Sequence, residues 1–280
     1  MTARLRLTAP LSSLDAWVNA FAQAEIPVLA ETAESLEHMR ATEDDIDAHG
    51  LAEMISTDPL MTLKVLAHAS EERRGRSSGL RADAETVTAA LVLMGITPFF
   101  RDFGPQTTLE TVLADHEEAL LGLSRVMQRA ERASRYALGF AAHRADPDAA
   151  VIHSAALLHD FAEMLLWVHA PDLALKVAAL QEADRHLRSS LAQRQALGIE
   201  LPDLEQALMR RWHLPELLTR ITGGRDGRDP QVRCVNLAVR LARHTARGWD
   251  DAGVPDDLHD IAELLNLSEA HALKLLHEFD

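Results

Sequence analysis

Apolar residues recur at spacings of three and four along nearly the whole chain, and no window keeps the alternation of apolar and polar residues that a half-buried strand requires. These spacings place side chains on one face of an α-helix, because the helix repeats every 3.6 residues. The sequence therefore predicts an all-α protein. Beyond short N-terminal helices around Leu14 to Phe21 and Leu51 to Ile55, the expected helices cover residues 29–39, 85–94, 116–143, 153–171, 171–184, 188–197, 202–212, 215–222, 230–247, 256–265 and 268–279.

Local signals mark the start of two of the N-terminal helices. Ser12 and Ser13 can cap the first helix, because a serine hydroxyl accepts a hydrogen bond from a backbone N–H of the first turn. The sequence Asp58-Pro59 predicts another start, since aspartate is a good N-cap and proline fits the first helical position.

The helical pattern is expected to be interrupted at three other places. Residues 72–83, ERRGRSSGLRAD, are expected to form a solvated loop, and Gly95 is expected to end the helix before it. The strongest internal seam is at residues 104–108, which contain glycine, proline and two threonines. We therefore expect two abutting helical sub-bundles, 14–104 and 105–280, that together form one unit.

Composition narrows the class of protein and its partners. The chain has 280 residues, 47% of them hydrophobic, and a net charge of −15 that repels a phosphate backbone, so no nucleic acid is expected. The single cysteine, Cys234, is expected to be a buried apolar residue in a reducing compartment. Neither a secretory signal nor an uninterrupted apolar run of membrane-spanning length is seen, so we expect a cytoplasmic protein without membrane contact.

The most informative segment is HSAALLHDFAEMLLWVHAP, residues 153–171, where His159 and Asp160 interrupt an otherwise apolar helix. Adjacent imidazole and carboxylate groups are what a metal-dependent phosphohydrolase would place there. A buried polar pair can equally be part of the structure, provided that neighbouring groups satisfy its hydrogen bonds.

The order of several segments resembles the HD-related output domain (HDOD) family of the HD phosphohydrolase superfamily. IPVLAET, LAEMISTDPLMTLKVLAHAS, VTAALVLMGI, AALLHDFAEMLL, RRWHLPELLTRI and VNLAVRLARH follow one another as in that family, over roughly residues 14–245. The resemblance implies an HD-domain-like helical bundle with an N-terminal helical sub-bundle. It also implies a bacterial signalling module that commonly acts without catalysis.

The resemblance implies further metal ligands that this chain lacks. Enzymes of the superfamily have a histidine on the helix before the His-Asp pair, where this chain has Arg129, Arg132 and Arg135. They have an aspartate on a late helix, at a place that resembles Val239 here. Some family members carry a His-His pair where this chain has glycines 223 and 224. Arginine cannot ligate a cation, so His159 and Asp160 are interpreted as a vestigial site, with no metal, no catalytic residue and no cofactor expected.

A rearranged site is the best alternative that the residues offer. On one continuous helix, His153, His159, Asp160 and Glu163 would fall in one stripe, and His143 lies at the end of the preceding helix. We favour a structural interpretation, in which this polar stripe is closed by hydrogen bonds and Asp160 pairs with an arginine of the preceding helix.

Other candidates have simpler structural explanations. The acidic run TEDDID at residues 42–47 lacks the ligand spacing of an EF-hand and suits a helix N-terminus. Trp212 is expected to be a core residue beside His213, and no glycine-rich phosphate-binding loop is present.

The sequence thus predicts a non-catalytic bacterial regulatory module, a pseudoenzyme that acts through an unknown protein partner or a small ligand in a cleft between the bundles. The alternative is a divergent metal-dependent phosphohydrolase. Nucleic-acid binding through a local basic patch at Arg129–Arg135 is a third, disfavoured class.

Overall fold

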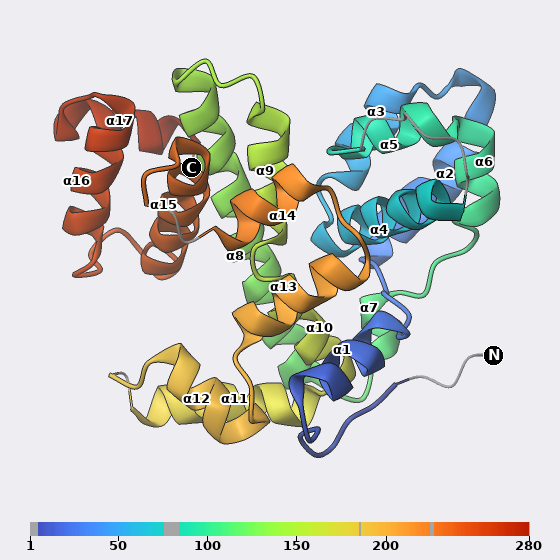
Figure 1. Ribbon diagram of the computed structural model, residues 1–280, viewed down its shortest axis with the longest axis horizontal. Helices are drawn as coiled ribbons and strands as arrows, with labels where there is room; N and C mark the ends of the chain where they lie inside the picture. Colours follow the sequence, from blue (N-terminus) through green and yellow to red (C-terminus); the bar gives the residue numbers. More distant parts are fainter. Residues whose placement is uncertain (1–4, 76–83, 185, 225–226, 280) are drawn as a thin grey trace. The chain divides into compact units, whose positions relative to one another are not determined.

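The computed structural model describes residues 5–75, 84–184, 186–224 and 227–279 (Figure 1). Within these ranges the chain is helical, and its β-structure consists of isolated bridges such as Val28 with Thr108. The all-α prediction is confirmed. The helices are α1 (Leu14–Ala22), α2 (Ala30–Arg40), the 3₁₀ turn η1 (Glu43–Asp45), α3 (Ala48–Ile55), α4 (Pro59–Gly75), α5 (Val87–Met94), α6 (Ile96–Asp102), α7 (Leu109–Val112), α8 (Glu117–His143), α9 (Ala149–Leu158), α10 (Phe161–His169), α11 (Pro171–Ala183), α12 (Ser189–Leu197), α13 (Leu201–Arg211), α14 (Glu216–Gly223), α15 (Pro230–His244), α16 (Val254–Leu265) and α17 (Glu269–Phe279).

The chain forms two compact units. The first comprises Met1–Val126 and Asp160–Leu214, and the second comprises Met127–His159 and Pro215–Asp280. Helix α8 contributes to both units, and both sides of the 104–108 seam lie in the first. Each unit is built from two separate segments of the chain and is defined by contacts rather than by continuous sequence. The units therefore do not test the predicted boundaries 14–104 and 105–280, which stay a prediction.

The predicted capping residues begin their helices. The Ser13 hydroxyl accepts a hydrogen bond from the Ala16 N–H at 3.2 Å, and Asp58 Oδ1 accepts from the Leu60 and Met61 N–H groups at 2.9 and 3.1 Å. Helix α4 continues through Gly75, so residues 72–75 are helical rather than part of the predicted loop. Glutamate and arginine at these positions are good helix formers. The rest of that loop, residues 76–83, lies outside the described residues.

The seam segment pairs with the chain between α1 and α2 in the first unit. The Val28 N–H donates to the Thr107 carbonyl at 3.0 Å, and the Leu109 N–H donates to the Val28 carbonyl at 2.8 Å. The Lys64 ammonium group on α4 donates to the Ile26 carbonyl at 3.0 Å and to the Gln106 side-chain oxygen at 2.5 Å. These bonds attach residues 104–108 to the N-terminal helices.

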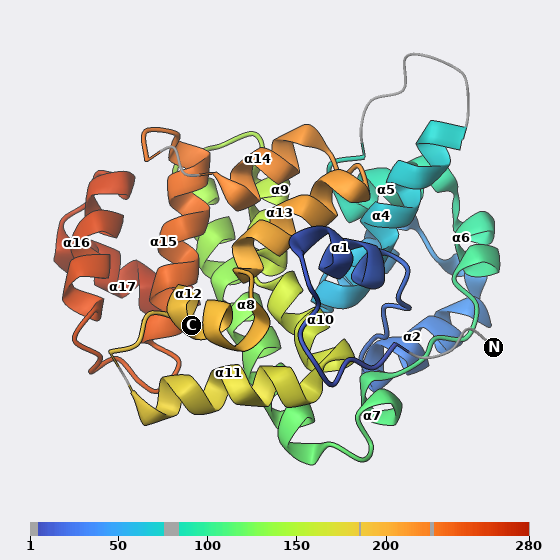
Figure 2. The same cartoon turned by 60° about the horizontal axis from the view of Figure 1, so that its bottom comes forward.

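Helices of the first unit pack in two groups. Helices α3, α4, α5 and α6 lie together (Figure 1), and α1 packs against α13 (Figures 1 and 2). Gly122 on α8 faces Trp167 on α10 so closely that a Cβ atom there would lie 2.5 Å from the indole ring. The absent side chain therefore allows the two helices to approach each other.

In the second unit, α15 packs between α9 and α14 on one side and α16 on another, and α16 packs against α17. The carboxylate of Asp257 on α16 is 1% exposed and accepts hydrogen bonds from Arg240 Nε at 2.5 Å and His244 Nδ1 at 2.6 Å, both on α15. A buried carboxylate with two cationic or polar partners holds these helices together.

The segment Ala149–His169 is long and apolar enough to cross a membrane, by length and composition only. Of its most apolar window, 72% is buried inside the protein, and core helices meet the same criterion.

The segment Ala149–His169 contains a break after Leu158, so the prediction of a single helix over 153–171 is wrong. Asp160 has φ −113° and ψ 21°, outside the helical range, and its carbonyl accepts hydrogen bonds from the Glu163 and Met164 N–H groups of α10. Aspartate favours such positions over helix interiors.

The close approach at Gly122 gives a test of the packing. Alanine normally stabilises an exposed helix position by up to about 1 kcal/mol relative to glycine. We expect Gly122→Ala instead to lower the free energy of unfolding by about 1–3 kcal/mol, because the new methyl group overlaps Trp167. Urea unfolding measures this. Gly104→Ala is the control, since a Cβ atom there would meet nothing within 4 Å. Equal stability of Gly122→Ala and wild type would contradict the packing.

Candidate functional site

The predicted His-Asp pair lies at the break between α9 and α10. His159 is the residue after α9 and Asp160 the residue before α10, and both are half-buried. The boundary between the two compact units falls between them. Because the helix is interrupted here, the predicted polar stripe on one continuous helix, from His153 to Glu163, is wrong. Both residues of the pair engage other groups of the protein.

Arginine 132, on the helix where a first histidine ligand would be sought, is committed to protein contacts. Its Nε donates to the Tyr136 hydroxyl at 3.0 Å, and its Nη1 donates to the Thr245 carbonyl at 2.8 Å. Arg135 is exposed and lies 3.7 Å from Glu131, with which it forms an ion pair. Val239 on α15 is 5% exposed and belongs to the core. In the second unit, Val239 therefore contributes to packing, and Arg132 makes a guanidinium–carbonyl contact.

The histidines that might have formed a rearranged site are placed separately within the second unit. His143 Nε2 lies 3.2 Å from the Leu265 carbonyl oxygen at the end of α16. Burial lowers the pKa of His153 on α9, which favours its neutral form. Among the described residues of this unit, neither belongs to a group of three residues whose ligand atoms converge.

The Gly223-Gly224 pair has a steric explanation. A Cβ atom on Gly224 would lie 2.5 Å from the Val232 side chain and 2.6 Å from the Arg220 carbonyl oxygen. Glycine therefore allows the chain after α14 to approach α15. A histidine could not be accommodated at this position without displacing that backbone.

Of three smaller predictions, those for Cys234 and for the acidic run are confirmed, and that for Trp212 is not. Cys234 is fully buried, and burial raises the pKa of its thiol to about 11, so the thiol is un-ionised at neutral pH. In the acidic run, Asp47 Oδ1 caps α3 by accepting from the Gly50 N–H at 2.7 Å. Trp212 was predicted to be a core residue, but it is only half-buried, with its ring centroid 5.9 Å from that of Phe161.

His213 lies among guanidinium groups on an otherwise acidic protein. Its ring contacts Arg74 of α4, and Arg73 and Arg211 are near enough that their charges, after the effect of burial, help to lower its pKa. Its backbone has φ 55°, a left-handed conformation that ends α13 sharply. Sequence inspection singled out this residue only as a neighbour of Trp212.

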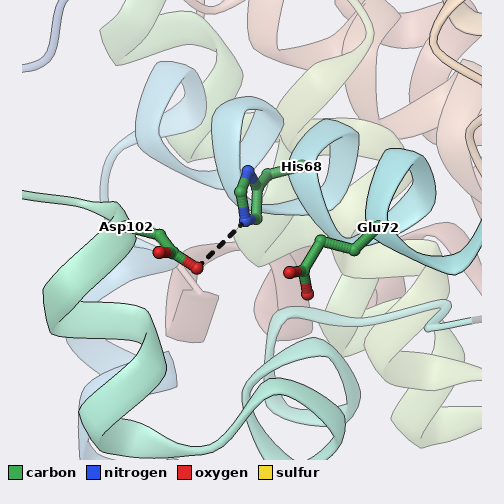
Figure 3. A group of neighbouring side chains, drawn as sticks. All are labelled: His68, Glu72 and Asp102. Carbon is green, nitrogen blue, oxygen red and sulfur yellow. Dashed lines mark ion pairs between the residues drawn. The ribbon is translucent and has the colours of Figure 1, made fainter. Parts of the chain in front are cut away.

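A further cluster was not predicted from the sequence. His68 and Glu72 on α4 and Asp102 at the end of α6 have ligand atoms that all lie within 4.8 Å of one another (Figure 3). The spacing of His68 and Glu72 by four residues was visible in the sequence, and it places both on one helix face. Asp102 is 30 positions later than Glu72 in the numbering, so only the tertiary fold shows that it completes the group.

The helical architecture and the His-Asp segment define an HD-related, all-α protein. The sequence model of the HDOD domain matches residues 26–224, most of the chain, and the chain belongs to the HDOD family. The resemblance noted from the sequence is thus confirmed.

Solved structures share the fold at low sequence identity. The MmoQ response regulator from Methylococcus capsulatus str. Bath has a TM-score of 0.67 and 18% identity, over 91% of this chain and 99% of that chain. A virulence factor from Campylobacter jejuni subsp. jejuni has a TM-score of 0.61 and 16% identity, over 95% of this chain and 97% of that chain. A comparison with curated protein sequences gives no significant match.

Proposed function

We propose that this protein is a non-catalytic bacterial signal-transduction module that acts in the cytoplasm through contacts with a regulatory protein partner. The observation that carries the proposal is the state of Arg132. Arg132 lies on α8, the helix where a metal-binding histidine would be needed, and its guanidinium group donates to the Tyr136 hydroxyl and to the Thr245 carbonyl at the end of α15. A cation beside a fixed guanidinium group is repelled, and the arginine provides no ligand atom.

Four further features support a regulatory rather than a hydrolytic role. Val239 is a core residue, and Gly224 is fixed by the close approach of α14 to α15. Without a bound ion, no group at the His-Asp pair would lower the pKa of water enough to make a nucleophile at neutral pH. The similarly folded MmoQ protein is described as a response regulator, which fits a signalling role.

The alternative function is a divergent metal-dependent phosphohydrolase that uses His159 and Asp160. The chain keeps two of the residues that metal-dependent hydrolysis needs. This chemistry also requires further metal ligands from other helices. Nucleic-acid binding remains a weaker alternative. Of the arginines proposed for a basic patch, Arg132 is bonded within the protein and Arg135 is paired with Glu131.

Asp160→Ala separates the regulatory from the hydrolytic function. Wild type and variant are both expected to leave phosphomonoesters, nucleotides and cyclic dinucleotides unhydrolysed above a buffer control, with and without Mn²⁺. The variant is expected to lose about 1–3 kcal/mol of unfolding free energy, because removing the half-buried Asp160 side chain leaves the groups that interact with it unsatisfied. Phosphate release and urea unfolding are the measurements.

The hydrolytic alternative predicts the opposite pattern for the same variant. Turnover by wild type that survives repurification and disappears in Asp160→Ala would overturn the non-catalytic proposal. So would a stability equal to wild type in metal-free buffer together with stabilisation of only the wild type by Mn²⁺.

Capture experiments test the protein-contact part of the proposal. Tagged protein expressed in its native bacterium is expected to retain one partner at comparable molar amounts, and the tagged partner should retain this protein in return. Sedimentation of the two purified proteins then measures the complex directly. No partner above a tag-only control, under growth conditions that differ in nutrient and stress, would count against a role through stable protein contacts.

A further inference from the structure

We propose that His68, Glu72 and Asp102 form a binding site for a divalent transition-metal ion of the zinc class, which would join α4 to α6. The site lies within the first compact unit and is separate from the His159-Asp160 signature. It does not depend on the proposed function, because a regulatory module and a hydrolase could each contain it. The expectation that the chain binds no metal is revised by this proposal, while the expectation for the His-Asp pair is unchanged.

The three side chains converge from two helices. His68 and Glu72 are four residues apart on α4, so they differ by about 40° around the helix axis and point to the same side. Asp102 is the last residue of α6 and faces them from across the gap, as Figure 3 shows. One imidazole nitrogen and two carboxylate oxygens then lie within 4.8 Å of one another.

The separation of His68 from Asp102 suits a bridging ion better than a direct bond. His68 Nε2 lies 3.7 Å from Asp102 Oδ2, which is too long for a hydrogen bond. The Nε2 atom is buried and has no hydrogen-bond partner among the described residues. Two ligand atoms bound to one tetrahedral zinc ion lie about 3.3 Å apart, from bond lengths of about 2.0–2.1 Å. A small side-chain adjustment would therefore place both atoms at ligand distance from one ion.

Arg101 orients the Asp102 carboxylate and competes with an ion for one of its oxygens. Arg101 Nε donates to Oδ1 at 2.8 Å, and its second nitrogen, Nη2, donates to Oδ2 at 3.0 Å. The Arg101 side chain is 68% exposed, so, unlike the fixed Arg132, it can release Oδ2 and turn its charge toward solvent when an ion binds. A ligating carboxylate that is hydrogen-bonded in this way is oriented toward its metal.

The position of the imidazole is fixed by packing. The His68 ring lies edge-on to the Phe103 ring, with centroids 5.0 Å apart and an interplanar angle of 69°. This contact limits rotation of the ring while Nε2 stays directed at Asp102. The entropic cost of ordering the imidazole on binding is thereby reduced.

The ligand set selects the class of ion. Imidazole disfavours Mg²⁺ and Ca²⁺, which prefer oxygen ligands alone. One nitrogen and two carboxylate oxygens suit Zn²⁺, and the affinity order of divalent ions places Mn²⁺ below it. Two carboxylates balance the charge of the ion, and three protein ligands leave a position for water or an external group.

The chain offers a matched control for this site. His49 and Glu53 on α3 are also four residues apart, with Nε2 and Oε1 separated by 3.4 Å. That pair is exposed, at 75% and 71%, and among the described residues it does not belong to a three-ligand group. It therefore measures how much Zn²⁺ an ordinary His–Glu pair of this protein retains.

The test is calorimetric titration of the chelator-treated full chain with Zn²⁺. Wild type is expected to bind about one equivalent tightly. Glu72→Gln and Asp102→Asn keep the side-chain size, and each should weaken binding by more than about 10-fold, the effect that loss of even an outer-sphere partner has. His68→Ala should do the same, whereas His49→Ala and Asp160→Ala should bind as wild type does. Wild type should also bind Mn²⁺ more weakly than Zn²⁺ and show no measurable affinity for Mg²⁺.

Each other result decides against the site. Absence of stoichiometric Zn²⁺ binding would overturn it, as would tight binding that persists in both Glu72→Gln and Asp102→Asn. Equal loss in His49→Ala would assign the ion to scattered surface histidines. Loss in Asp160→Ala with retention in the α4 and α6 variants would instead support the hydrolase and contradict the non-catalytic proposal. Urea unfolding in metal-free buffer checks that each variant is folded.

Discussion

The arrangement of the first unit depends on the hydrogen bonds that the Asp58 carboxylate accepts. It is completely buried and accepts hydrogen bonds from the Leu60 and Met61 N–H groups at the start of α4. Its second oxygen accepts from the Leu29 N–H at 2.9 Å, just before α2 begins. Burial is the largest influence on the pKa of Asp58 and raises it, while the hydrogen bonds, including one from Thr32, oppose that effect. One side chain thus caps a helix and ties two segments of chain that are 29 residues apart.

The consequences extend along α4 to the candidate metal ligands. Lys64, one turn and a half further on, is bonded to the Ile26 carbonyl and to Gln106 at 2.5 Å, and it fixes the same helix to the chain before α2 and to the seam. Burial lowers the pKa of this ammonium group, as expected for a cation held among protein atoms. His68 and Glu72 follow on this fixed helix. Their approach to Asp102 is therefore a property of the packed unit rather than of a loop.

Polar groups of the second unit are used differently, since many of them bond to one another. Besides Arg132 and the Asp257 carboxylate, Gln231 on α15 donates to Asp146 at 3.1 Å and to Asp148 at 2.8 Å. These contacts attach the loop between α8 and α9 to the start of α15. Such internal pairing is consistent with the proposal that this unit is a packed scaffold.

The sequence was most informative where a short range of residues decides the structure. The caps at Ser13 and Asp58 and the helix end at Gly95 depend on side chains or glycine within a few residues, and each was predicted correctly. The break at Asp160 was missed, because apolar spacing continues across it and hides a change in backbone angles. The seam at 104–108 and the convergence of His68 with Asp102 depend on contacts between distant segments, which periodicity does not encode.

The position of a bound ion tests the central claim most directly, namely that the His-Asp signature of this chain no longer holds a metal. Crystals soaked in Zn²⁺ and measured at the zinc absorption edge would locate it by anomalous scattering. We predict a peak between His68, Glu72 and Asp102 and none beside His159 and Asp160. A peak at His159 and Asp160, with its ligands completed by other protein residues, would contradict the account.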